Sequence, residues 1–245
     1  MAAPSSLLPY LEAGGTVAEW GTTLAACVAT LVALDFGLCR PLCGPGRWFA
    51  LHALTNMIIV AFCLPELARL WPDPVVGLVQ STAVLSRVPL AMNLAVHTYH
   101  VVLWLEEMQW IDWLHHGLMT FVAIPACLAC NMGPVVNLMH FFVLGLPGGI
   151  DYALLSLVKM QRLSPLREKS LNCTLNLWLR SPGIVMCTTL GYLQLCFVRT
   201  LYAMPVLELG CRALLLTLFP WNCQFFLDRV IRSHERHLVK GKASK

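Results

Sequence analysis

Charged residues are scarce in this chain of 245 residues, in which Asp, Glu, Lys and Arg together make up 12%. Soluble proteins have about 25%. Hydrophobic residues make up 58%, and the mean hydropathy is +0.67. This composition excludes an ordinary soluble domain, because too few polar side chains exist to cover a surface that faces water. It predicts an all-α fold, a multi-pass transmembrane helical bundle without a soluble module.

The signatures of several enzyme classes are absent as well. The sequence has no GxSxG nucleophile elbow, no phosphate-binding P-loop and no dinucleotide fingerprint. One CxxC pair, Cys127 and Cys130, has no second pair that would complete a zinc site. Most of the 11 cysteines lie in apolar runs, where a free thiol acts as a small apolar side chain. We therefore expect neither a metal centre nor a bound cofactor.

Long apolar runs, by contrast, occur along the whole chain. A helix needs roughly 20 residues to cross the hydrocarbon core of a bilayer. The third run is too long for one straight crossing and carries Arg87 and Pro89, so we expect a kinked helix there. The seven expected spans are Val17–Cys39, Trp48–Leu64, Val75–Leu105, Trp113–Cys130, Val135–Val158, Gly183–Leu201 and Pro205–Leu227.

Lys and Arg are distributed unevenly between the expected loops. With the amino terminus outside, the cytosolic segments hold Arg40, Arg47 and the basic residues of 159–180 and 229–245. Because positive residues favour the cytosolic side, seven spans satisfy this bias. The net charge of +4 then reflects topology, and we expect no binding of nucleic acid. The expected parts are an amino-terminal segment with the first helix (1–46), a six-helix membrane domain (47–228) and a basic cytosolic tail (229–245).

Polar side chains inside the third expected span share one helix face. Their spacings of three, four and seven residues place them within about 60° of one another. Polar groups are costly at membrane depth, so such a face is a candidate binding site for a lipid or substrate. The alternative is a packing face whose amides and imidazoles bond to neighbouring helices. The residues are Ser86, Asn93, His97, His100 and Trp104.

The fourth expected span places a carboxylate, Asp112, three and four residues before His115 and His116. A carboxylate that holds one imidazole nitrogen leaves the other free to take a proton or bind a ligand. Adjacent residues of a helix point about 100° apart. We therefore expect one ring to face a cavity and the other to be a packed support. The alternative is two structural histidines near the membrane interface.

The fifth expected span carries His140, a further candidate for the binding site, and then the glycine- and proline-containing segment Gly145–Tyr152. Backbone broken at membrane depth survives only inside protein or beside water. We therefore expect a break in this helix next to the site, with the buried acid Asp151 held by a partner. The alternative is a kink with a structural ion pair. The expected partners of Asp151 are His97, His115, His116 and Arg199.

Five of the eight histidines lie in three consecutive expected spans, which raises the possibility of a metal-dependent membrane oxidase. Such di-iron enzymes are expected to carry several HxxxH or HxxHH boxes, whereas this chain has one HxxH and one HH. We therefore expect no metal ligands. His52 and Asn56, four residues apart in the second span, add a weaker polar pair.

Asp112, the pair His115–His116, Thr120 and the segment Asp151–Lys159 together resemble the TLC domain family. That family is named for translocating-chain-associated membrane protein, the Lag ceramide synthases and their relatives. The similar region runs from about Arg47 to Leu227. The resemblance implies a six-helix barrel with a lipid-sized cavity, a place in the endoplasmic reticulum or another endomembrane, and a role in lipid synthesis, sensing or trafficking.

The ceramide synthase branch of that family uses its paired histidines to transfer an acyl group from a fatty acyl thioester to a long-chain base. In that branch a His-Asp pair precedes the later acid, and here Gly148 and Gly149 take those places. The homeobox-like insertion of the branch is absent too. The resemblance therefore implies catalytic roles for His115, His116 and Asp151 only.

Two functions are compatible with these residues. The first, which we favour, is a non-enzymatic protein that binds or senses membrane lipids such as a sphingolipid or a fatty acyl chain. The second is an acyltransferase with acyl-CoA as co-substrate, in which His115 or His116 is base or nucleophile, Asp112 orients it, and Asp151 or His97 holds the second substrate. A transporter is a third possibility, motivated by the expected helix break, but the sequence has no internal repeat.

Overall fold

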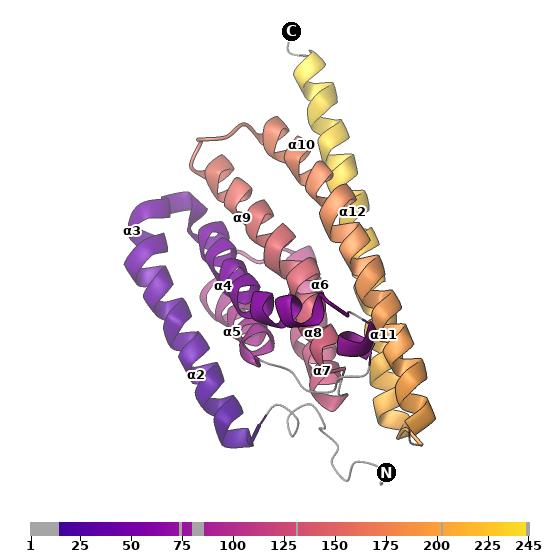
Figure 1. Cartoon of the computed structure of the whole chain (residues 1–245). Helices are drawn as coiled ribbons and strands as arrows, with labels where there is room; N and C mark the ends of the chain where they lie inside the picture. Colours follow the sequence, from indigo (N-terminus) through magenta and orange to yellow (C-terminus); the bar gives the residue numbers. More distant parts are fainter. Residues whose placement is uncertain (1–14, 74, 80–85, 131, 202, 244–245) are drawn as a thin grey trace.

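The fold in the computed structural model is all-α throughout the described residues, which are 15–73, 75–79, 86–130, 132–201 and 203–243. Long helices run beside one another along the bundle (Figure 1). The predicted all-α class and the presence of helices long and apolar enough to cross a membrane are thus confirmed. Four helical stretches are long and apolar enough to cross a bilayer: Val17–Leu70, Trp110–Ala129, Pro134–Lys159 and Pro165–Leu201.

Several short helical elements continue one another end to end, so that α-helical, π-helical and 3-10 turns form longer rods. The elements in chain order are α2 (Val17–Leu34), η1 (Asp35–Cys39), α3 (Arg40–Cys43), η2 (Gly44–Gly46), α4 (Arg47–Leu70), η3 (Val75–Val79), α5 (Val88–Leu103), α6 (Trp110–Leu118), η4 (Met119–Ala123), α7 (Ile124–Ala129), α8 (Pro134–His140), η5 (Phe141–Gly145), α9 (Leu146–Lys159), α10 (Pro165–Leu175), η6 (Asn176–Arg180), α11 (Ser181–Leu201) and α12 (Val206–Ala243).

The first stretch, Val17–Leu70, folds back on itself. Thr16 and Glu19 start α2 with a reciprocal capping box. Gly44 then adopts a φ of +46°, a conformation that glycine reaches without the steric cost of a Cβ. As a result α4 returns alongside α2 (Figure 1), and the two limbs correspond to the first two expected spans.

The third expected span is not a single kinked helix. The helix α5 begins only at Val88, and the two residues before it, Ser86 and Arg87, are not helical. Pro89 lies in the first turn of α5, where its missing N–H removes no helical hydrogen bond. Ser86 therefore does not belong to the polar face of α5, and its hydroxyl instead accepts a hydrogen bond from Val88 N at 3.2 Å. The segment 80–85 lies outside the described residues.

The expected break after His140 is wrong as well. The elements α8, η5 and α9 form one continuous rod from Pro134 to Lys159. The π-helical turn η5 ends at Gly145, two residues before Pro147, which lies in the first turn of α9. A π turn is a local adjustment that lets a helix continue past a residue without an N–H. The helix is therefore distorted at this point, and its backbone is not opened.

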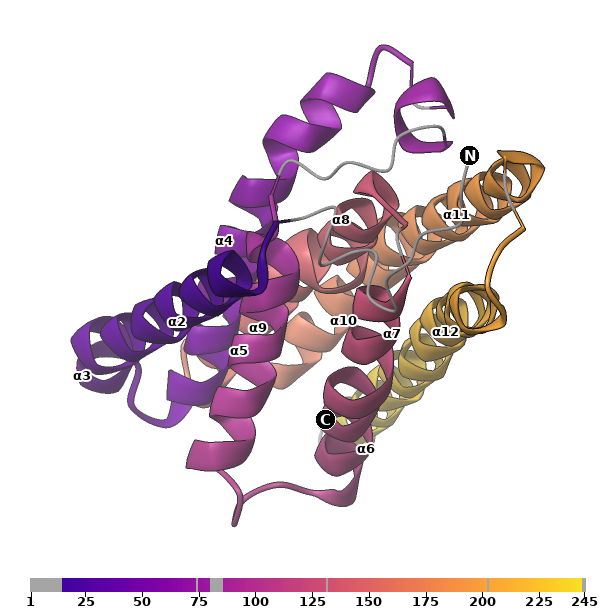
Figure 2. The same cartoon turned by 90° about the horizontal axis from the view of Figure 1, so that it is seen from below.

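Two helices extend beyond their expected bounds. The rod α10–η6–α11 begins at Pro165, whereas the expected span began at Gly183, and α12 continues through the expected tail to Ala243. In the view from below, α9 and α10 lie between α4 and α12 (Figure 2), and α9 packs on both α4 and α10. The segment 165–180 is thus part of the bundle, which brings its polar residues to the site described below.

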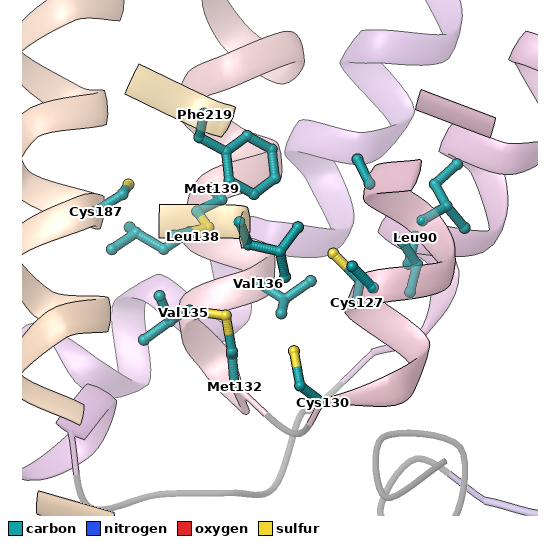
Figure 3. Packing of buried hydrophobic residues seen from close by; sticks show 14 of the residues in the cluster. Leu90, Cys127, Cys130, Met132, Val135, Val136, Leu138, Met139, Cys187 and Phe219 are labelled. Atoms are coloured by element: carbon teal, nitrogen blue, oxygen red, sulfur yellow. The ribbon is translucent and has the colours of Figure 1, made fainter. Parts of the chain in front are cut away.

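A cluster of buried apolar side chains packs around α7 and α8. Its cysteine and methionine sulfur atoms lie among aliphatic side chains (Figure 3), and both members of the CxxC pair are buried free thiols. A thiol in such surroundings acts as an apolar side chain. The labelled members are Leu90, Cys127, Cys130, Met132, Val135, Val136, Leu138, Met139, Cys187 and Phe219.

Candidate functional site

A cavity of about 260 Å³ lies inside the bundle between α5, α6, α9, η6, α11 and α12. One part of its lining is apolar, with side chains from α6, η4, η5, α11 and α12. The other part is polar and carries both positively and negatively charged side chains. The apolar lining includes Ile111, Met119, Val143, Leu144, Ile184, Phe226 and Val230, and the polar lining consists of His97, Asp112, His115, Asp151, Tyr152, Arg180, Asn222 and Arg229.

The imidazoles of His97 and His115 bond to each other at this cavity. His97 Nδ1 lies 2.8 Å from the backbone oxygen of Asn93. Because a carbonyl only accepts, this nitrogen carries the proton, and His97 Nε2 of a neutral ring is an acceptor. His115 Nε2, 3.2 Å away, therefore donates to it. This leaves His115 Nδ1 as an acceptor, which is buried and has no hydrogen-bond partner in the described structure.

The two adjacent histidines take different positions, as their angular separation predicts. His115 lines the cavity, whereas His116 is buried and packs its ring 4.9 Å from that of His97. The carboxylate of Asp112 holds neither ring. Its Oδ2 accepts a hydrogen bond from the backbone N of Gln109 at 3.0 Å and so caps α6. His115 is thus oriented by His97, and Asp112 contributes a charge to the cavity lining.

Asn93 and His140 form a hydrogen-bonded pair outside the cavity lining. Asn93 Nδ2 donates to His140 Nε2 at 3.1 Å, and His140 Nδ1 donates to the backbone oxygen of Val136 at 2.7 Å. Both nitrogens of His140 are thereby satisfied. This pair links α5 to α8, which is the packing role that the sequence left open as an alternative.

A cluster of stacked histidine and tryptophan rings lies next to the site. His100 stacks between His52 and Trp48, with ring centroids 3.7 Å and 3.9 Å away. The ring of Trp104 lies edge-on to that of His100, with centroids 4.9 Å apart. The ring of His116 is also edge-on to that of His100, at 5.8 Å. In the structure as described, these five side chains do not line the cavity. The expected binding face of α5 is therefore divided, since only His97 reaches the cavity.

Asp151 lines the cavity, but the prediction of its partners is wrong. Its Oδ1 accepts a hydrogen bond from Asn172 Nδ2 at 2.6 Å. Asn176 Nδ2 in turn donates to Asn172 Oδ1 at 2.5 Å, and Arg180 Nη1 donates to Asn176 Oδ1 at 2.9 Å. Glu168 Oε1 also accepts from Asn172 Nδ2, at 3.3 Å. These bonds connect five residues, which we call the polar ladder: Asp151, Glu168, Asn172, Asn176 and Arg180.

Sequence reasoning assigned no role to several residues of this lining. It placed Arg180 in a cytosolic loop and Arg229 in the tail, and it gave no part to Asn222. A signal was present, because Glu168, Asn172, Asn176 and Arg180 follow one another at intervals of four residues. Such spacing places polar side chains on a single helix face, and it would have extended the sixth helix to include them.

Gly148 and Gly149 allow α9 to approach α4 closely beside the cavity. A Cβ on Gly148 would lie 2.9 Å from Asn56 Nδ2 and 3.6 Å from Arg180 Nη2. A Cβ on Gly149 would lie 2.9 Å from Met57 Sδ. A side chain at either position would therefore require the ends of the Asn56 and Met57 side chains to move aside.

Neither a metal centre nor a known relative accounts for this set of side chains. Within the described ranges, no group of three or more His, Cys, Asp or Glu side chains is placed to hold a metal ion. The chain matches no family model, no curated protein and no solved structure.

Proposed function

We propose that this chain is a multi-pass protein of an endomembrane that binds a lipid in the cavity. The observation that carries the proposal is the division of one lining into an apolar part and a polar part that holds positive and negative charges. An apolar wall accommodates an acyl chain, and buried polar groups orient a head group. The resemblance to the TLC domain family supports the same class of ligand.

The size of the cavity limits how much of the lipid it encloses. Pockets for drug-sized ligands measure about 300–1,000 Å³, and this cavity measures about 260 Å³. It therefore suits a head group and the first part of a chain, with the remainder lying between helices or in the bilayer. We further propose seven crossings, formed by α2, α4, α5, α6–α7, α8–α9, α10–α11 and α12, with the amino terminus outside.

Filling the cavity should remove the bound lipid. Val143 lines the cavity, and the indole of Val143→Trp would occupy much of the apolar part. We expect the lipid that copurifies with the protein in mild detergent, quantified by mass spectrometry per mole of protein, to fall at least tenfold, a loss of about 1.4 kcal/mol or more in binding free energy.

Val185→Trp is the matched control for this experiment. Val185 is 60% exposed on α11 and lies outside the cavity lining. This variant should retain as much lipid as the unmodified protein. Lipid binding in the cavity is contradicted if Val143→Trp retains its lipid, or if the unmodified protein carries none.

The His97–His115 bond supports acyl transfer as a second candidate function, because His115 Nδ1 is left as a buried acceptor. For a binding protein, His115→Ala should lower the free energy of unfolding by about 1–3 kcal/mol, since His97 loses a hydrogen-bond partner. For an acyltransferase, it should lower turnover by about a hundredfold or more. We expect the first result and no product from the unmodified protein.

The assay combines the purified protein with acyl thioesters and a panel of long-chain amines, followed by mass spectrometry of the products. His234→Ala is the control, because His234 lies on α12 beyond the cavity lining. Product that disappears in His115→Ala, while the melting temperature and the activity of His234→Ala are unchanged, would replace the binding proposal with acyl transfer.

A further inference from the structure

We infer that the head group held in this cavity is zwitterionic and combines a phosphate with an ammonium group. The inference rests on the proposed lipid binding and specifies its ligand. The phosphate would lie at Arg180 and Arg229, and the ammonium group would lie at Asp112 and Asp151, all of which line the cavity.

The charges of the lining are balanced but do not neutralise one another by direct contact. Two guanidinium groups and two carboxylates face the same cavity. Among the described residues, neither Arg180 nor Arg229 forms an ion pair with Asp112 or Asp151. Asp112, Asp151 and Arg180 are partly buried, and Arg229 lies at the exposed edge of the lining. Unpaired charges within a membrane protein are costly and mark ligand sites. Both signs are therefore available to a ligand that carries both.

Arg180 has hydrogen-bond donors without acceptors. Arg180 Nη1 donates to Asn176 Oδ1 of the polar ladder. Arg180 Nε, in contrast, is buried and has no hydrogen-bond partner in the described structure. Nη2 lies beside Gly148, which lines the cavity. A buried N–H without an acceptor is rare in native proteins and costs about 1–3 kcal/mol. A phosphate would satisfy it, because the guanidinium fork matches the spacing of phosphate oxygens.

The orientation of the polar ladder fixes where the ligand can bond. Arg180 donates to Asn176, Asn176 donates to Asn172, and Asn172 donates to Asp151. Each amide thus turns its oxygen toward the guanidinium and its nitrogen toward the acid. Asp151 Oδ1 is occupied by Asn172, as Asp112 Oδ2 is by Gln109 N. Each carboxylate keeps a second oxygen that can accept from an ammonium group.

Head groups of a single charge fit this lining less well. A purely anionic head group would satisfy Arg180 but would also face two carboxylates. A long-chain amine without phosphate would satisfy the carboxylates and leave Arg180 Nε without an acceptor. The imidazoles of His97 and His115 also face the cavity, and the unpartnered His115 Nδ1 is an acceptor that favours a ligand with an N–H donor.

The test compares binding of three lipids with the same acyl chains: phosphatidylethanolamine, phosphatidic acid and diacylglycerol. A chain-free head group, glycerophosphoethanolamine, serves as a soluble competitor. We expect phosphatidylethanolamine to bind at least tenfold more tightly than diacylglycerol, with phosphatidic acid between them and the soluble competitor far weaker than the lipid. Arg180→Gln should weaken binding of both phosphate-bearing lipids at least tenfold and leave diacylglycerol unchanged.

Asp112→Asn should weaken phosphatidylethanolamine but not phosphatidic acid, since it removes a negative charge and keeps an oxygen for the helix cap. Arg69→Gln, an exposed position at the end of α4 outside the cavity, should change nothing. Equal binding of all three lipids would overturn the inference and leave lipid binding intact, whereas binding of none would overturn both. Phosphatidic acid binding as tightly as phosphatidylethanolamine, or a competitor as strong as the lipid, would also overturn the inference.

Discussion

Asp35→Asn should lower the free energy of unfolding by about 3–5 kcal/mol, the cost of removing one partner from a buried ion pair. The carboxylate of Asp35 is fully buried and accepts from Arg47 Nε and Nη2, both at 2.6 Å. The Tyr99 hydroxyl donates to it at 2.8 Å. The amide of Asn lacks the charge and can accept with one atom only, so Arg47 loses its counter-charge.

This loss is measured by titrating the protein with SDS in mixed micelles. Asp228→Asn is the control, because the Asp228–Arg232 pair has the same chemistry with side chains 58% and 70% exposed. Solvent screens an exposed pair, so Asp228→Asn should change stability far less than Asp35→Asn. If Asp35→Asn destabilises the protein no more than Asp228→Asn does, the bonds of Asp35 to Arg47 and Tyr99 do not hold η1, α4 and α5 together.

Arg212→Met should have an effect of similar size, again about 3–5 kcal/mol. The side chain of Arg212 is 1% exposed and donates to Glu208 Oε1 from Nε at 3.0 Å and from Nη2 at 2.9 Å. Its Nη1 donates to Gln194 Oε1 at 3.1 Å and so joins α12 to α11. Methionine keeps most of the length of arginine but leaves the charge of Glu208 without this guanidinium.

The double variant Glu208→Leu/Arg212→Met distinguishes charge burial from packing. Replacing both members of a buried pair by apolar side chains is often nearly neutral, so the double variant should be more stable than Arg212→Met alone. The same SDS titration measures both. A double variant that is less stable than Arg212→Met would show that packing around Arg212, and not the buried charge, dominates.

The candidate site shows where local patterns predict correctly and where they do not. His115 and His116 take a cavity position and a packed position because adjacent residues of any helix point in different directions. His97 and His100 lie three residues apart on α5, so the sequence places them on one face. In the structure His97 bonds to His115 at the cavity, and His100 stacks on His52, because different helices pack against the two ends of that face.

The sequence by itself determined that this protein is all-α with helices suited to a membrane, because scarce charge and long apolar runs leave the backbone few other ways to satisfy its hydrogen bonds. It also indicated His97, His115, Asp112 and Asp151 as polar residues in a membrane setting. Only the tertiary structure decided which partners they have. Asp151 bonds to Asn172 on α10 because helix pairing and rotation depend on side-chain packing across the whole bundle, which no local spacing records.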